Sequence, residues 1–261
     1  MKLSMFAFLK RIESESVEID SRERALIHRY YIATNPYLQS VYNTWYSDLF
    51  QMLDFKKDMK VLELGSGSRA VLSDQNDLHR HLITSDVSPG LGTDLVIDSE
   101  KIPLGNASLN GLLTVNVFHH FMNVENFFSE AMRVLKPGGK IVMCEPWYSP
   151  WSAFVYRNFH HEDFNPGAGW QLEAAGPLSR ANGAQAWIVF KRDRQIYESK
   201  YPSLNIIDIR PHTAVNYILS GGYSFKPMVP VQWYSTVDKI DQLLSSAGIP
   251  MFANICLKKI G

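Results

Sequence analysis

The stretch from Val61 to Ser68 reads Val-Leu-Glu-Leu-Gly-Ser-Gly-Ser and places a Gly-x-Gly turn directly after a short apolar run. Such a run is typical of a buried strand, and glycines let the chain turn sharply at its carboxyl end. A helix that starts after the turn offers free N–H groups to an anionic part of a ligand. Asp86 follows the next expected strand, where a carboxylate can accept hydrogen bonds from ribose hydroxyls. Together these features predict a site for an adenosine-containing cofactor.

Short apolar runs and helical segments alternate between residues 60 and 146. Strands are expected at 60–64, 82–85, 94–97, 111–115 and 140–144. A helix is expected between the last two, ended by the turn Pro137-Gly138-Gly139, with an apolar face of Val124, Phe127, Phe128, Ala131, Met132 and Leu135. This alternation predicts an α/β fold with a parallel sheet that is covered on both faces.

Residues 14–60 are expected to be helical. Asp20 and Glu23 resemble a capping box, and Asn35-Pro36 is typical of the start of a second helix. That helix carries an apolar stripe at helical spacing: Tyr37, Leu38, Val41, Tyr42, Trp45, Tyr46, Leu49, Phe50 and Leu53. Such a stripe usually packs on a core. We therefore expect a helical N-terminal extension over residues 1–59.

The first residues, Met1 to Ile12, combine apolar side chains with Lys2, Lys10 and Arg11. A helix of this kind either rests on a membrane surface or packs on the body of the protein, and both interpretations stay open. The apolar run is too short for the core of a signal peptide. Peripheral membrane contact through the N-terminus is thus one hypothesis.

The C-terminal part begins with a dense aromatic stretch: Trp147, Tyr148, Trp151, Phe154, Tyr156, Phe159, Phe164 and Trp170. These rings form either a lid over an apolar acceptor or a packing layer. A helix is then expected at 184–199, a strand at 204–209, a helix capped by Ser235 or Thr236, and a strand at 251–257. We expect 60–261 to form one domain, with 147–203 as an elaboration on the substrate side.

Charge and cysteine content restrict the class of partner. Lysine plus arginine and aspartate plus glutamate number 26 each, so no global field favours nucleic acid. The segment after the fourth strand, Asn116-Val117-Phe118-His119, is not the Asp/Asn-Pro-Pro-Tyr/Phe loop expected for methylation of a base. Two cysteines cannot form a disulfide framework, which favours a reducing, cytoplasmic setting. We expect a small-molecule or lipid-like substrate and no nucleic acid.

Two kinds of cofactor compete for the glycine turn. Gly65, Gly67 and Ala70 satisfy the dinucleotide pattern Gly-x-Gly-x-x-(Gly/Ala), which keeps a nicotinamide or flavin dinucleotide open. Glu63, two residues before the first glycine, can help hold an ammonium group, whereas it would repel a pyrophosphate. The carboxylate therefore favours a cofactor with a cationic group.

Further motifs follow in order: Asp98-Ser99 and Ile102-Pro103-Leu104 after the third strand, Asn116 to His120 after the fourth, and Arg133 to Gly139 before the fifth. With the glycine turn and Asp86, this order resembles class I S-adenosylmethionine-dependent methyltransferases, especially those that act on small molecules and lipids. The resemblance implies a three-layer sandwich around a mainly parallel seven-stranded sheet, the Rossmann-like methyltransferase fold. Its last strand would lie antiparallel beside the fifth. Cys144 and Cys256 would then be buried sheet neighbours rather than a redox pair.

The same resemblance implies which residues contact S-adenosyl-L-methionine. Glu63, Gly65 and Gly67 would line its methionine end, Asp86 would hold the ribose, Asp98 with Ser99 would face the adenine, and Asn116 would sit beside the sulfonium. Ser66, Val87 and Val117 complete the expected set. Arg69 stands where the family usually has a third glycine, which leaves the path of the loop open.

Methyl transfer from a sulfonium is an in-line displacement in which charge disappears, so positioning is the main requirement. A base is needed only when the acceptor is a hydroxyl or a protonated amine. The candidates at the carboxyl edge of the sheet are His119, His120, Glu145 and Tyr148. A second polar cluster contains His160, His161 and Glu162. Adjacent histidines on a helix or strand chelate poorly, so we expect no metal.

The leading hypothesis is a methyltransferase that moves the methyl group of S-adenosylmethionine to a small-molecule or lipid-linked acceptor. One alternative is a non-catalytic cofactor-binding protein of the same fold. Another is an NAD(P)-dependent oxidoreductase. The acceptor, the methylated atom and the oligomeric state are not identified by the sequence.

Overall fold

A computed structural model describes residues 17–67, 79–160, 162–173, 176 and 179–261. Its centre is a seven-stranded sheet in the order β3-β2-β1-β4-β5-β7-β6. The strands are β1 (Val61–Leu64), β2 (Leu82–Asp86), β3 (Leu95–Val96), β4 (Leu109–Val115), β5 (Leu135–Pro146), β6 (Leu204–His212) and β7 (Phe252–Lys259). Strands β1 to β5 run parallel, while β7 is antiparallel to both β5 and β6. The expected α/β class and the inserted last strand are both confirmed.

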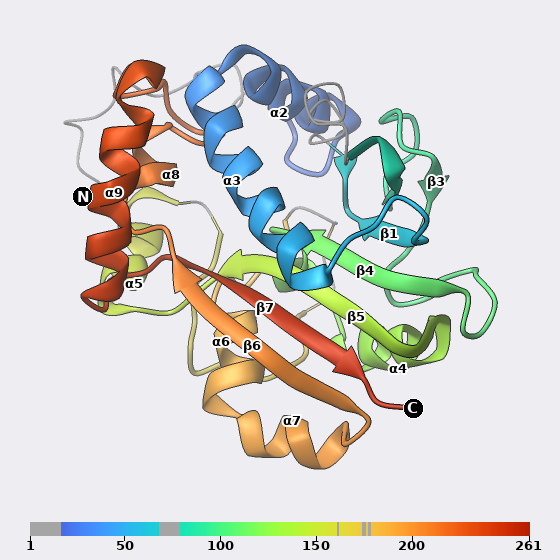
Figure 1. The fold of residues 1–261 in the computed structure, drawn as a ribbon. Helices are drawn as coiled ribbons and strands as arrows, with labels where there is room; N and C mark the ends of the chain where they lie inside the picture. The colour runs from blue at the N-terminus through green and yellow to red at the C-terminus, as the bar shows by residue number, and fades with distance from the viewer. Residues whose placement is uncertain (1–16, 68–78, 161, 174–175, 177–178) are drawn as a thin grey trace.

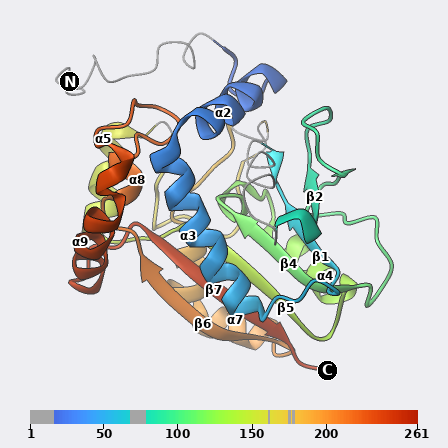
Figure 2. The ribbon, with the colours of Figure 1, turned by 45° about the horizontal axis from the view of Figure 1, so that its top comes forward.

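Helices cover both faces of the sheet (Figure 1). They are α2 (Arg22–Thr34), α3 (Pro36–Leu53), α4 (Val124–Val134), α5 (Pro150–Phe159), α6 (Gln185–Trp187), α7 (Arg194–Lys200), α8 (Asn216–Leu219) and α9 (Tyr234–Ser246), with a π-helical turn at Ile188–Arg192. Helix α3 crosses one face, and α4, α6 and α7 lie against the other (Figures 1 and 2). This is the expected three-layer sandwich. In the described part of the chain, no helix is long and apolar enough to cross a membrane.

The alternation of side chains along the strands divides the core into two clusters. Val61, Leu113 and Val142 pack on the α3 side, while their neighbours Leu62 and Leu112 pack on the α4 side. Successive side chains of a strand point to opposite faces, so strands that are apolar at every position must be covered twice. Burial of both faces fixes the sheet between its helical layers.

Helix α3 begins and packs as the sequence predicts. The Asn35 side-chain oxygen accepts a hydrogen bond from the Leu38 backbone N–H at 3.1 Å, and Pro36 occupies the first turn. Every residue of the expected apolar stripe is buried, and the stripe belongs to the same core cluster as Val142 and Cys256. The aromatic stripe therefore serves as core.

Several details differ from the expectations. Ser21, not Asp20, caps α2, because the Ser21 hydroxyl accepts from the Arg24 backbone N–H. Helix α9 starts at Tyr234 without a side-chain cap, because a 3₁₀ turn at Val231–Trp233 leads straight into it. The Pro137-Gly138-Gly139 turn lies inside β5 rather than before it, since α4 already ends at Val134. Local start and stop signals thus locate the elements but not every terminal residue.

The two cysteines are buried, as expected, and they are not joined in a disulfide. Cys256 lies opposite Val142, and Cys144 lies opposite Asn254 in the β5–β7 ladder. They are therefore on adjacent strands but are not a directly opposed pair.

Four expectations fall on residues outside those that the structure describes. They concern the membrane contact of Met1–Ile12, the helix expected to start after the glycine turn, the effect of Arg69 on the cofactor loop, and the position of His161. All four stay predictions.

Candidate functional site

The Gly-x-Gly turn after β1 is packed too tightly for any side chain. Gly65 has a φ of +66°, and a Cβ atom there would lie 2.5 Å from Val117 Cγ2. A Cβ at Gly67 would lie 2.6 Å from Asp86 Oδ2. The turn is thus held between the loop after β4 and the carboxylate that ends β2. This brings together four residues that the sequence predicts to bind the cofactor: Gly65, Gly67, Asp86 and Val117.

Replacing Gly65 with alanine is expected to lower the free energy of unfolding by about 1–3 kcal/mol, because it combines left-handed strain with a clash. Removing the opposing methyls with Val117→Ala relieves the clash but not the strain. Urea denaturation of both single variants and the double variant should therefore show favourable coupling of about 1 kcal/mol between the two substitutions. Wild-type stability of Gly65→Ala would contradict the packing described here.

Ser66 ties the turn to the neighbouring strand. Its backbone N–H donates to the Ser85 carbonyl at 2.7 Å, and its hydroxyl accepts from the Ser85 N–H at 3.2 Å. The same hydroxyl donates to the Glu63 carbonyl at 3.3 Å. Ser66 is fully buried, so its side chain stabilises the turn from the protein interior.

Glu63 is buried below the glycine turn and faces α3. The Tyr46 hydroxyl donates a hydrogen bond to its Oε1 atom. Only 3% of Glu63 is exposed, so any ligand group that it meets must reach into the interior. A helix of the N-terminal extension thereby positions a carboxylate of the expected cofactor site.

The residues after β2 and β3 lie at the carboxyl edge of the sheet. Asp86 is half-buried, and its Oδ1 accepts from the Ser88 backbone N–H at 2.9 Å. The next side chain, Val87, is 49% exposed and offers an apolar surface beside that carboxylate. Asp98 is exposed and accepts from the Glu100 N–H at 2.9 Å, and Ser99 beside it is half-buried. This edge presents polar and apolar groups together, as a nucleoside requires.

Asn116 follows β4 in a left-handed conformation, with a φ of 54°. Its N–H donates to the Cys144 carbonyl at 2.9 Å, which anchors the backbone to β5. Its side-chain Oδ1 is buried and has no hydrogen-bond partner among the described residues. A buried polar atom without a partner is unusual in a folded protein and suits the donor group of a ligand. The place of Asn116 beside a cofactor stays a prediction, which this unpartnered oxygen favours.

Glu145 organises the loop after β4. Its Oε1 accepts from the backbone N–H groups of Val117 and Phe118 at 2.8 and 2.9 Å. Its Oε2 accepts from Nδ1 of His119 at 2.7 Å, and the whole side chain is buried. Its Oε2 also accepts from the His119 backbone N–H at 3.4 Å. Four donors hold this carboxylate, so its position indicates a role in placing the loop and the His119 ring.

His119 and His120 converge on Glu162, which follows α5. His119 Nε2 lies 3.5 Å from Glu162 Oε2, and His120 Nε2 lies 3.6 Å from Glu162 Oε1. Burial opposes the charged form of His119, but the hydrogen bond that its ring donates to Glu145 and the nearby Glu162 carboxylate outweigh burial and raise the pKa of His119 to about 10. Burial and the charge of His119 lower the pKa of His120 to about 4. One histidine is thus charged and the other neutral near pH 7.

Tyr148 and the aromatic stretch form a packed layer. Tyr148 is half-buried and lies 4.8 Å from the Trp187 ring between centroids. Tyr156 and Phe164 are buried and stacked at 4.6 Å. Of the two interpretations that the sequence leaves open, the structure supports packing for these rings. Helix α5, which carries part of the stretch, was not predicted, although Ser149 and Ser152 form a capping box around Pro150.

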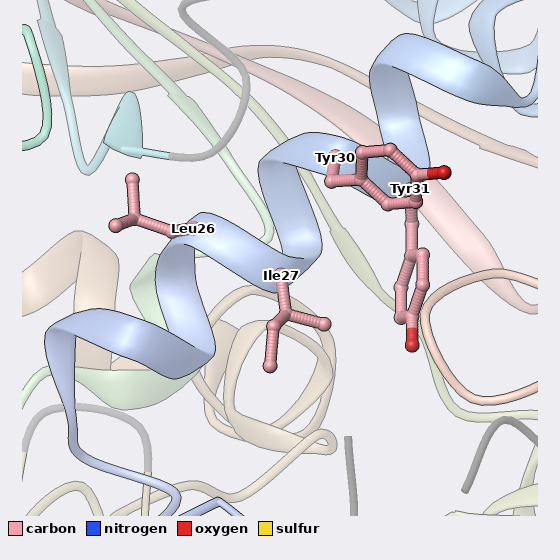
Figure 3. A pocket seen from close by; sticks show the side chains of 4 residues that line it. All are labelled: Leu26, Ile27, Tyr30 and Tyr31. Atoms are coloured by element: carbon pink, nitrogen blue, oxygen red, sulfur yellow. The ribbon is translucent and has the colours of Figure 1, made fainter. Parts of the chain in front are cut away.

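Helix α2 contacts the loop after β2, a contact that the sequence did not predict. Arg22 Nη2 donates to the Gly90 carbonyl at 3.0 Å, and Arg29 Nη1 donates to the Leu91 carbonyl at 2.7 Å. An open pocket of about 360 Å³ lies against the same helix, lined by Leu26, Ile27, Tyr30 and Tyr31 (Figure 3). Helix α2 therefore holds the loop that follows Asp86 and β2 in place through these two hydrogen bonds.

The strand order and the glycine turn at the carboxyl edge define a class I, Rossmann-like methyltransferase fold. Residues 62–143 match the family model described as a methyltransferase domain. The matched segment runs from β1 to the middle of β5 and includes Asp86, Asn116, His119 and His120. No curated protein matches the whole sequence at a significant level.

Solved structures share the fold at low sequence identity. Geranyl diphosphate C-methyltransferase from Streptomyces coelicolor, solved with Mg²⁺, geranyl diphosphate and S-adenosyl-L-homocysteine, is 12% identical with a TM-score of 0.53. The match covers 85% of this chain and 82% of that one. A chain from the complex between the Haloferax volcanii Trm112 activator and a putative methyltransferase is 11% identical, covers 93% and 97% of the two chains, and has a TM-score of 0.53. These likenesses concern the fold.

Proposed function

We propose that the protein is an S-adenosylmethionine-dependent methyltransferase that moves a methyl group to a small-molecule or lipid-linked acceptor. The observation that carries the proposal is the glycine turn held between Asp86 and Val117 inside a methyltransferase domain. Asp86 holds the ribose, Val87, Asp98 and Ser99 bound the adenine, and the unpartnered Asn116 oxygen faces the methionine part. Glu63 supports the turn from the α3 side.

The cofactor supplies an electrophilic methyl group on a sulfonium, whose positive charge is lost as the acceptor attacks in line. The chain's own residues therefore act mainly by holding the acceptor and the methyl group together and by excluding water. Glu145 fixes the loop after β4 through the N–H groups of Val117 and Phe118. His119 and His120 lie on that loop, and Tyr148 follows β5, so these residues bound the acceptor side.

A small, apolar acceptor is the preferred substrate class. Two solved neighbours are geranyl diphosphate methyltransferases, including one with geranyl diphosphate and sinefungin that is 10% identical, covers 84% of this chain and 77% of that one, and has a TM-score of 0.50. Most of the aromatic layer after β5 packs on the core, and its partly buried rings Tyr148, Trp151 and Phe159 are the apolar surface left for such an acceptor. The two buried cysteines, which are not joined in a disulfide, accord with a reducing, cytoplasmic setting.

A thermal comparison separates this function from its alternatives. S-adenosyl-L-homocysteine at about a hundredfold excess over its Kd should raise the Tm by roughly 5–10 °C, whereas NAD⁺ and NADP⁺ should not. Stabilisation by the dinucleotides alone would point to an oxidoreductase.

Activity is tested separately, with cofactor labelled in the methyl group and fractionated cell extract as the acceptor pool. Label in small metabolites or lipids supports the proposal. Label in nucleic acid would contradict the acceptor class, and cofactor binding without any transfer would favour a non-catalytic binding protein.

A further inference from the structure

His119, His120 and Glu162 form a compact group of metal-ligating side chains that methyl transfer itself does not require. One nitrogen of each ring and one oxygen of Glu162 lie within 4.8 Å of one another. The group joins two separate parts of the chain, the 3₁₀ turn Phe118–His120 after β4 and the segment after α5. All three side chains are at most 14% exposed. A bound ion would therefore be shielded from bulk water.

Each histidine is oriented from behind by a hydrogen bond at its other nitrogen. His119 Nδ1 donates to the Glu145 carboxylate, and His120 Nδ1 donates to the Arg180 carbonyl, both at 2.7 Å. Outer partners of these two kinds are what metal-binding histidines almost always have, because they fix the ring and its tautomer. Both Nε2 atoms are thereby directed toward the same carboxylate.

The hydrogen bond of His120 fixes which of its nitrogens faces Glu162. A carbonyl oxygen can only accept, so Nδ1 of His120 carries a proton, and Nε2 is the nitrogen that is left to bind a metal ion. This Nε2 atom faces Glu162 Oε1 at 3.6 Å. Other charged or titratable groups near the cluster are Glu145, Tyr156, Arg180 and His160, whose Nδ1 lies 3.6 Å from Glu162 Oε2.

The spacing fits a four-coordinate ion better than direct hydrogen bonds. Separations of 3.5 and 3.6 Å between Nε2 and carboxylate atoms exceed the ordinary N–H···O distance of about 2.7–3.2 Å. Tetrahedral Zn²⁺ with bonds of about 2.0–2.2 Å places its ligand atoms about 3.3–3.6 Å apart. These two separations involve different oxygens of Glu162, so the carboxylate must turn until one oxygen faces both rings. His119, which is charged near pH 7, must also release its Nε2 proton to solvent when the ion binds.

We propose that His119, His120 and Glu162 bind one divalent transition-metal ion of the zinc type, with a fourth position for water or an oxygen of the acceptor. Two histidines and one carboxylate that leave one position open are typical of zinc sites that act on substrates. The sequence predicted no metal because adjacent histidines diverge on a helix or strand. On the 3₁₀ turn their ring centroids are only 4.2 Å apart, which removes that objection.

The test titrates the full-length protein, first freed of metal by a chelator, with Zn²⁺ in an isothermal calorimeter. One ion per chain is expected for the wild type. Glu162→Gln and His120→Gln should each weaken binding by about 100-fold or more, since losing even an outer partner of a ligand costs about 10–100-fold. His81→Gln is the matched control, because His81 is exposed at the opposite end of β2 from Asp86 and should leave the affinity unchanged.

A measurement on the wild type guards against variants that fail to fold. Co²⁺ in a four-coordinate nitrogen and oxygen site absorbs visible light far more strongly than the aqueous ion, so adding Co²⁺ to the metal-free protein should produce such a spectrum, and Zn²⁺ should abolish it. The absence of stoichiometric binding and of the spectrum would overturn the proposal. Equal affinity of folded Glu162→Gln and wild type would overturn it as well. Because no methyl transfer is measured, failure here is distinct from failure of the proposed function.

Discussion

Glu145→Ala is expected to lower the free energy of unfolding by about 3–5 kcal/mol, among the largest effects of any single substitution in this chain. The substitution leaves the N–H groups of Val117 and Phe118 and the His119 ring without their shared acceptor. Each unsatisfied buried donor costs about 1–3 kcal/mol, and the positive His119 ring loses its nearest counter-charge. Urea denaturation followed by circular dichroism measures the loss.

Two further variants show whether the hydrogen bonds or merely the volume of Glu145 matter. Glu145→Gln keeps one acceptor oxygen and nearly the same shape but turns an amide toward the His119 N–H, so it should lose roughly half as much as alanine. Glu173→Ala removes an exposed carboxylate and should change stability by no more than about 0.5 kcal/mol. A loss below about 1 kcal/mol for Glu145→Ala would contradict the central position assigned to this carboxylate.

The features that the sequence predicted correctly depend on local patterns. The strands β1, β2 and β4 each contain a short apolar run, namely Val61-Leu62, Leu82-Ile83 and Leu112-Leu113, and Asn35-Pro36 marks the start of α3 with a cap and a proline. These hydrophobic patterns and caps each lie within one strand or helix, so the sequence alone suffices to locate that strand or helix. The sheet order was implied by the family resemblance rather than by the pattern, because strand order depends on contacts between distant segments.

The site was predicted less completely because its remaining parts come from distant segments. Glu162 meets His119 across 43 positions of sequence, and no periodicity links them. Arg22 and Arg29 donate to carbonyls 68 and 62 residues away. Nothing in the sequence distinguishes these two arginines from other surface arginines, so their partners could not be predicted. By contrast, the start of α5 could have been predicted from Ser149-Pro150, because a serine cap followed by proline is typical of a helix N-terminus. It was missed because the segment was interpreted only as an aromatic stretch. Long-range polar contacts thus require the structure, whereas a missed cap does not.

Replacing Asp86 with alanine is expected to weaken binding of S-adenosyl-L-homocysteine by about 100-fold. Two hydrogen bonds from ribose hydroxyls to a carboxylate are worth about 1.5 kcal/mol or more each, and 1.4 kcal/mol corresponds to a tenfold change in Kd. Within the protein, Asp86 accepts from the Ser88 N–H at the loop after β2, a half-buried position. The substitution should therefore lower the Tm of the ligand-free protein much less than it reduces the rise in Tm that the ligand causes.

Asp86→Asn separates the two hydrogen bonds, because the amide keeps one acceptor oxygen and loses the charge. Its Kd should lie between those of the wild type and Asp86→Ala, about tenfold above the wild type. Asp58→Ala, at an exposed site before β1, is the matched control and should bind like the wild type. If Asp86→Ala bound S-adenosyl-L-homocysteine with unchanged affinity while remaining folded, the carboxylate over Gly67 would not hold the ribose, and the cofactor would have to lie elsewhere along the edge.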